Sequence, residues 1–171
     1  MRYIACLVAG LGLAIPAAAA ALPSLAENPA NKLLSRGIDP IEYDPATRCN
    51  GGHIPPGTKA MLAWLERNAA GVNWGEYRCE MWGKHSASLH SAGRAIDWHP
   101  ATPRDGRALV TLLLAPDSDG NVAALARRMG IQGLIYDCKS WFGGWDGQLS
   151  NYSYCFDKRG KRKKQLDPIP A

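Results

Sequence analysis

SLHSAGRAID, residues 88–97 of this chain of 171 residues, places a histidine and an aspartate on either side of a glycine. Gly93 lets the backbone turn sharply or approach a neighbouring segment closely, so His90 and Asp97 can be brought together. A neutral imidazole and a carboxylate are two of the three protein ligands typical of a catalytic zinc ion, which keeps its fourth position for water. The stretch therefore predicts two zinc ligands. The alternative is a surface loop with a solvated histidine and a capping aspartate.

The residues that end this stretch are typical of a β-strand, which we expect over residues 94–99. Side chains alternate between the two faces of a strand, so Asp97 and His99 share one face while Ile96 and Trp98 share the other. We expect the apolar face to be buried and Asp97 to face a cleft. His99 is then a candidate for a place beside the metal or the substrate.

The N-terminus has the features of a secretion signal peptide, which we assign to residues 1–21. Arg2 supplies the positive charge, an apolar run follows it, and small residues at 17–21 or at 24–26 offer cleavage sites. The apolar run is shorter than the roughly 20 residues that span a bilayer, and no later run is longer and as apolar. We therefore expect a secreted or cell-envelope protein without a membrane span.

The cysteine content is typical of a disulfide-stabilised protein. Cys49, Cys79, Cys138 and Cys155 remain after the signal peptide, and an even number in an oxidising compartment favours disulfides. More than one pairing is possible. We prefer Cys49–Cys79 and Cys138–Cys155, because each pair closes a local loop in a separate half of the chain. A zinc site made of cysteines is disfavoured, because the chain has no Cys-x-x-Cys pair.

Hydrophobic periodicity predicts an α+β fold, with a small antiparallel sheet and flanking helices. Residues 22–45 are rich in turn-forming residues and are predicted to be an irregular arm, and the folded domain is expected over residues 46–171. The predicted elements are a helix from residue 56 to Gly71, strands over 72–81, 94–99 and 131–136, a loop over 84–89, and helices over 103–114 and 122–129, the last capped by Asp119.

The pattern Ser-x-His-x-x-Gly-x-Ala-x-Asp at residues 88–97 resembles the zinc D-alanyl-D-alanine peptidase and hedgehog superfamily. The likeness extends from Ala46 onward and is greatest to a secreted, extensin-like bacterial subgroup. The other stretches that carry it are TRC at 47–49, AWLE at 63–66, RCE at 78–80, ARRMGIQ at 126–132 and YSYCF at 152–156.

The resemblance implies the fold of these peptidases, with zinc bound by His90 and Asp97. It also implies that Arg78, on the preceding strand, holds or polarises the substrate carbonyl. Pairing of Arg78 with Glu76 or Glu80 on the strand surface is the alternative. Ser88, from the motif, and His99 are expected next to the metal or the substrate.

The chain departs from these relatives near its end. They supply the third zinc ligand and the general base from a His-x-Asp-His-x-His segment, whereas this sequence has no histidine after His99. We therefore expect the domain to be C-terminally incomplete. His99 is one possible substitute, and His53 and His85 are expected to be solvated loop residues. The resemblance implies an exported zinc metallopeptidase acting on peptidoglycan peptides; the alternative is a non-catalytic or truncated relative that binds such peptides without turnover.

The chain carries 20 Lys and Arg residues against 15 Asp and Glu, and its basic residues are concentrated at 158–164. Such a cluster attracts anionic wall polymers or lipid head groups. A solvated hairpin edge, on which cations discourage strand pairing, is the reading we prefer. Nucleic acid is not an expected partner, because the protein is expected to be exported and has no known nucleic-acid-binding motif. The sequence leaves the oligomeric state open.

Overall fold

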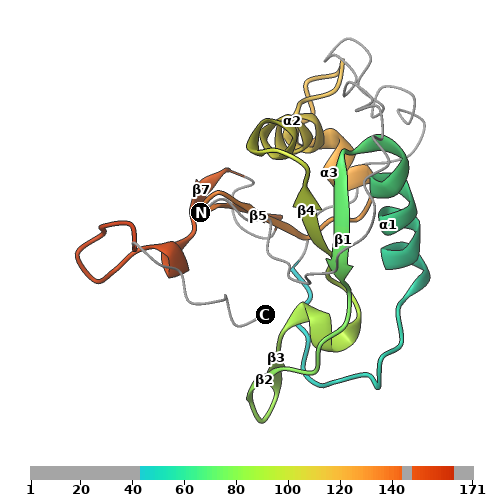
Figure 1. Cartoon of the computed structure of the whole chain (residues 1–171), viewed down its shortest axis with the longest axis vertical. Coiled ribbons are helices and arrows are strands. Elements are labelled where there is room, and N and C mark those ends of the chain that lie inside the picture. The colour runs from blue at the N-terminus through green and yellow to red at the C-terminus, as the bar shows by residue number, and fades with distance from the viewer. Residues whose placement is uncertain (1–42, 144–147, 164–171) are drawn as a thin grey trace. The chain divides into compact units, whose positions relative to one another are not determined.

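The computed structural model describes residues 43–143 and 148–163 (Figure 1). The described chain forms two compact units, which we call the first unit (residues 45–106) and the second unit (residues 43–44, 107–143 and 148–163). The predicted signal peptide (1–21), nearly all of the predicted arm (22–45) and the end of the predicted domain (164–171) lie outside the described residues. No helix in the described ranges has the length and apolar character needed to span a membrane.

The first unit combines one α-helix with two small antiparallel sheets. Helix α1 begins with a proline at its N-terminus, buries Leu65 and ends at Asn68. Strand β1 pairs with β4, and β2 pairs with β3, both antiparallel. The elements are α1 (Pro56–Asn68), β1 (Gly71–Gly75), β2 (Met81–Gly83), β3 (Ser86–Ala87), the 3₁₀ helix η3 (Leu89–Ala92) and β4 (Asp97–Pro100).

Helix α2 (Pro103–Leu114) starts at the end of the first unit and continues into the second. The second unit adds α3 (Ala124–Arg128), an antiparallel sheet of three strands in the order β5-β6-β7, and the 3₁₀ helix η4. The strands are β5 (Gly133–Tyr136), β6 (Lys139–Phe142) and β7 (Ser150–Asn151), and η4 is Ser153–Cys155. The buried apolar side chains of the second unit include Leu109, Leu112, Leu113, Leu125 and Trp141.

The expected α+β composition, with small antiparallel sheets and helices, is confirmed. The helices predicted at 56–70 and 103–114 are present as α1 and α2, although Gly71 begins β1 instead of ending α1. The structure also contains the disulfides Cys49–Cys79 and Cys138–Cys155, the same two pairs that the sequence analysis preferred.

Several boundaries were wrong. The strand predicted over 72–81 ends at Gly75, where a register shift and a φ of 144° interrupt the ladder with β4. The strand predicted over 94–99 starts only at Asp97, and the loop predicted over 84–89 contains β3 and the start of η3. Strands β6 and β7 had no counterpart in the prediction.

Helix α3 is shorter than the predicted 122–129, and Asp119 is not its N-cap. The residue at the N-cap position is Ala123, whose φ of 51° is left-handed. A different aspartate organises the preceding turn: Oδ1 of Asp117 accepts hydrogen bonds from the backbone N–H groups of Asp119 and Asn121, at 3.0 and 2.9 Å. The sequence analysis predicted a role for Asp119 as the cap and did not single out Asp117.

Asp117 also forms a buried ion pair in the second unit. Its Oδ2 lies 2.6 Å from Nη2 of Arg128, and the two side chains are 0% and 2% exposed. Burial alone raises the pKa of the Asp117 carboxyl. Hydrogen bonds from Asn121, Arg128 and the backbone of Asp119 outweigh burial, so the pKa lies below its usual value.

This carboxylate makes stability depend on acid pH. Because the folded-state pKa of Asp117 is lowered, its contribution is fully present above about pH 3.8 and is lost as the pH falls through the lower, folded-state pKa. We expect Asp117→Asn to be less stable than the wild type at neutral pH, with a difference that shrinks as the pH falls. Urea unfolding of both proteins between neutral and strongly acid pH measures this. A difference that stays constant with pH would contradict the assignment.

Candidate metal-binding site

His90 lies in the 3₁₀ helix η3, and the residues that cap this helix at its two ends fix the position of the His90 backbone. The Ser88 hydroxyl accepts a hydrogen bond from the backbone N–H of His90 at 3.3 Å, which places Ser88 as the N-cap of this short helix. Gly93 ends the helix in the left-handed conformation (φ 66°), and its N–H donates to the carbonyl of His90 at 2.9 Å. Ser88 and His90 are both buried. In the structure, the hydroxyl of Ser88 therefore orients the backbone that carries His90.

The structure brings together the two residues that the motif singled out. Nε2 of His90 lies 3.2 Å from Oδ1 of Asp97, and Nδ1 of His90 lies 3.2 Å from the backbone carbonyl oxygen of Glu76. Asp97 is 3% exposed, so it is buried. Gly75 is its partner in the β1–β4 ladder and has no side chain to occupy the space opposite it.

The orientation of the imidazole determines what this pair can bind. When Nδ1–H donates to the Glu76 carbonyl, Nε2 presents its lone pair to the carboxylate of Asp97. Two electron-rich atoms at this distance need a proton or a cation between them. A ligating histidine commonly donates its other ring N–H to a backbone carbonyl, and this bond fixes its tautomer.

Arg78 is the third side chain of the site. Its Nη1 lies 3.2 Å from Oδ2 of Asp97, so it pairs with Asp97 and not with Glu76 or Glu80. Arg78 does not lie on a strand, because residues 76–80 have no regular secondary structure. Its Nε and Nη2 atoms are buried and have no hydrogen-bond partner among the described residues. These two N–H donors therefore have no acceptor in the described chain, although the Arg78 side chain as a whole is 39% exposed.

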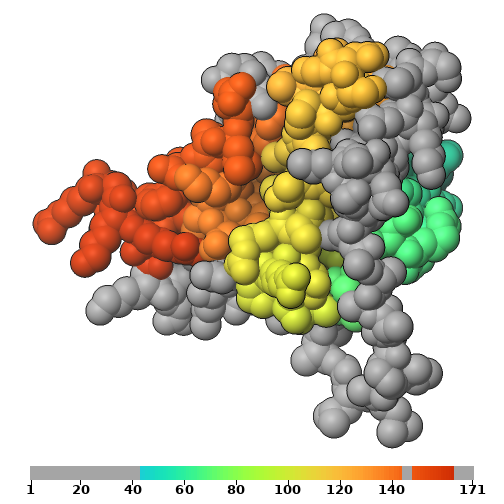
Figure 2. All heavy atoms as spheres, turned by 90° about the horizontal axis from the view of Figure 1, so that it is seen from above, coloured from blue at the N-terminus to red at the C-terminus, as the bar shows by residue number. Residues whose placement is uncertain are grey.

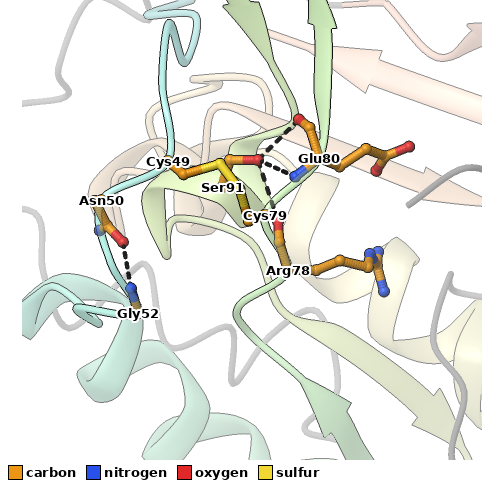
Figure 3. The surroundings of a disulfide bond; sticks show 7 residues. All are labelled: Cys49, Asn50, Gly52, Arg78, Cys79, Glu80 and Ser91. Carbon is orange, nitrogen blue, oxygen red and sulfur yellow. Dashed lines mark hydrogen bonds between the residues drawn. A yellow bond between two sulfur atoms is a disulfide. The ribbon is translucent and has the colours of Figure 1, made fainter.

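A disulfide and a buried serine hold the segment that carries Arg78 (Figure 3). Cys79 is bonded to Cys49, and Ser91, which is fully buried, contacts the backbone on both sides of Cys79. The Ser91 hydroxyl accepts a hydrogen bond from the N–H of Glu80 at 2.7 Å and lies 3.1 and 2.9 Å from the carbonyl oxygens of Arg78 and Glu80. Nothing in the sequence pattern distinguished Ser91 from its neighbours.

His99 does not complete the pair. Its ring stacks on Trp74, with ring centroids 4.2 Å apart and planes 4° from parallel, and its Nδ1 is buried without a hydrogen-bond partner in the described chain. No group of three His, Cys, Asp or Glu residues in the described ranges could hold a metal ion. His53 and His85 are exposed, as expected of solvated loop histidines.

The His90–Asp97 pair fits two positions of a zinc site. In a tetrahedral site with ligand bonds of about 2.05 Å, a nitrogen and an oxygen ligand are roughly 3.3 Å apart. The observed separation of Nε2 and Oδ1 is 3.2 Å. The donor types and their spacing therefore suit zinc, whereas the described residues provide no third protein ligand.

Comparisons of this chain with known protein families, with curated proteins and with solved structures found no match. The peptidase resemblance of residues 88–97 therefore stays a prediction from the sequence.

Proposed function

We propose that this chain is an exported zinc-peptidase-like domain of the D-alanyl-D-alanine peptidase and hedgehog type, which acts on cell-wall peptides. One observation carries the proposal. His90 Nε2 and Asp97 Oδ1 meet at 3.2 Å, while His90 Nδ1 is engaged by the Glu76 carbonyl. This arrangement supports a pair of zinc ligands in which a hydrogen bond to a backbone carbonyl orients the histidine ring.

Each residue of the site has a distinct role in this proposal. His90 and Asp97 hold the metal, and the Glu76 carbonyl fixes the histidine ring. Bound zinc would supply a Lewis acid that polarises a peptide carbonyl and acidifies a water molecule. Arg78 would orient the substrate, because its side chain is 39% exposed and its Nε and Nη2 have no acceptor in the described chain.

A second candidate is a relative that binds wall peptides without cleaving them. Two observations favour it. The described residues provide only two protein donors for zinc, and Arg78 already occupies the second carboxylate oxygen of Asp97. In a site without a general base, proton-transfer chemistry is slower by roughly a hundred- to ten-thousandfold. The same residues would then serve to recognise a peptide.

Zinc binding tests the ligand pair directly. The oxidised, chelator-treated protein is dialysed against micromolar zinc and its metal content is measured. We expect about one zinc ion per chain for the wild type, and an affinity lower by about a hundredfold or more for His90→Ala, because a ligand is lost. His85→Ala is the matched control, since His85 is exposed on the β2–β3 turn and should leave zinc binding unchanged.

The two candidates differ in turnover. Release of D-alanine from purified peptidoglycan, dependent on zinc and lost in His90→Ala, would support the peptidase. Peptide binding that Arg78→Gln weakens, with no release of product, would support the binding protein. A wild type that takes up no zinc, or equal loss of zinc in His90→Ala and His85→Ala, would overturn the metal site.

A further inference from the structure

The basic run near the end of the described chain forms a closed turn, which we call the basic turn (residues 157–163). Its two ends meet: Phe156 and Arg162 form an isolated antiparallel bridge, and the N–H of Lys163 donates to the carbonyl of Cys155 at 3.0 Å. Figure 1 shows it in red as a loop that follows η4. The run is therefore a defined structural element and not an unstructured tail.

Two connections fix the basic turn to the sheet of the second unit. Cys155, just before the turn, is bonded to Cys138, which lies between β5 and β6. Arg162 Nη2 lies 2.8 Å from Oδ1 of Asp137, the residue before Cys138. A disulfide and an ion pair thus attach the basic turn to neighbouring residues of the β5–β6 connection. These two attachments restrict the movement of the turn relative to the sheet.

The charges of this turn are strongly unbalanced. All five cations are exposed: Lys158, Arg159, Lys161, Arg162 and Lys163. The single acid, Asp157, uses Oδ1 to accept the N–H groups of Arg159 and Lys161 at 2.8 and 2.9 Å, so its carboxylate organises the backbone of the turn. In the space-filling view the red atoms of this segment lie at the surface (Figure 2).

A neighbouring tyrosine contacts one of the cations of the basic turn. The ammonium of Lys163 lies 4.5 Å from the centre of the Tyr154 ring, a cation–π contact, and Tyr152 lies beside Tyr154 with ring centroids 6.3 Å apart. Burial, followed by the proximity of Tyr154 and Tyr43, raises the pKa of Tyr152. Its hydroxyl stays uncharged at neutral pH and adds no negative charge to the surface.

Protection of a sheet edge does not account for these residues. The edges of the three-stranded sheet are β5 and β7, and the basic turn belongs to neither strand. Its own ladder is a single isolated bridge, which offers little edge to protect. The cations are gathered at one turn instead of being distributed along a strand.

We propose that the basic turn binds a flexible linear polyanion with repeating phosphate groups, such as a phosphate-bearing polymer of the cell envelope. Lysine and arginine are donors only, and arginine can form paired hydrogen bonds with phosphate oxygens. A polymer suits an exposed turn, since it can contact several cations in succession without an enclosing pocket. Insertion into a bilayer is disfavoured because residues 157–163 carry no apolar side chain to enter it. This inference goes beyond the proposed peptidase function and does not depend on the zinc ligands.

Binding to long-chain inorganic polyphosphate tests the proposal in the full chain. If about four cations contact phosphates, raising the salt from about 50 to 200 mM should weaken binding roughly fiftyfold, by analogy with single-stranded nucleic acids. The variant Lys158→Gln/Arg159→Gln/Lys161→Gln should bind at least about tenfold more weakly at low salt and show a shallower salt dependence.

A matched variant separates the effect of the basic turn on polyphosphate binding from the effect of the net charge of the protein. Lys59→Gln/Arg67→Gln/Arg104→Gln removes the same number of exposed cations from α1 and α2 and should bind polyphosphate like the wild type. An equal loss in both variants, or no binding by the wild type, would overturn the proposal. Binding to phosphatidylglycerol vesicles without binding to polyphosphate would also overturn it, in favour of a membrane surface. Circular dichroism of each variant verifies that it is folded.

Discussion

Replacing Cys49 and Cys79 together by serine will lower the free energy of unfolding by about 3.5 kcal/mol, since the bond closes a loop between residues 30 apart in the sequence. The cross-link reduces the number of conformations open to the unfolded chain, so its loss favours unfolding. Urea unfolding of the two oxidised proteins measures the change. We also expect weaker zinc binding, because Cys79 anchors the segment that carries Arg78 and the Glu76 carbonyl.

Removal of the other disulfide is the matched control. Cys138→Ser/Cys155→Ser opens a loop between residues 17 apart and should cost about 3 kcal/mol. Its loss should leave zinc binding unchanged, because both cysteines belong to the second unit and the ligand pair to the first. Equal weakening of zinc binding in both double variants would show that Cys49–Cys79 acts only through general stability.

Gly93→Ala is expected to destabilise the protein by about 3 kcal/mol, since two unfavourable effects combine. Gly93 has a φ of 66°, which disfavours residues with a Cβ atom. A Cβ atom at this position would also overlap the carbonyl oxygen of His53, a backbone atom that cannot move aside easily. Thermal and urea unfolding of the variant give the size of the effect.

Gly51→Ala separates these two effects. Gly51 has a similar φ of 76°, but a Cβ atom there would have no neighbour within 4 Å. Its substitution should therefore cost only the backbone term, about 1 kcal/mol. If Gly93→Ala costs no more than Gly51→Ala, the close approach to His53 does not contribute to stability.

Local signals in the sequence predicted a substantial part of this structure. The role of Gly93 is one example: both expected uses of a glycine, a turn and a close approach, occur at that residue. Helix α1 followed from its apolar spacing, and the preferred disulfides followed from the short loops that they close. The meeting of His90 and Asp97 was predicted because a single turn of the chain joins them.

Other features, which depend on how separate segments pack together, were not predicted. Residues 76–80 have strand-like composition, yet a disulfide and the buried hydroxyl of Ser91 replace the ladder hydrogen bonds of a strand there. The partner of Arg78 depends on how this segment lies against Asp97, which strand periodicity does not specify. The burial of Asp97 likewise results from the packing of β1, β4 and η3 and not from its place in the motif.

The stacking of His99 on Trp74 has a spectroscopic consequence. An indole ring whose centre is 4.2 Å from the imidazole shields the protons of that imidazole, so the His99 ring signals move upfield in a proton NMR spectrum. The chain has only four histidines, and His53 and His85 are exposed. His90 is therefore the other histidine that is not exposed to solvent. One spectrum can then report through His99 whether β1 and β4 remain paired, and through His90 whether its ring binds a metal ion.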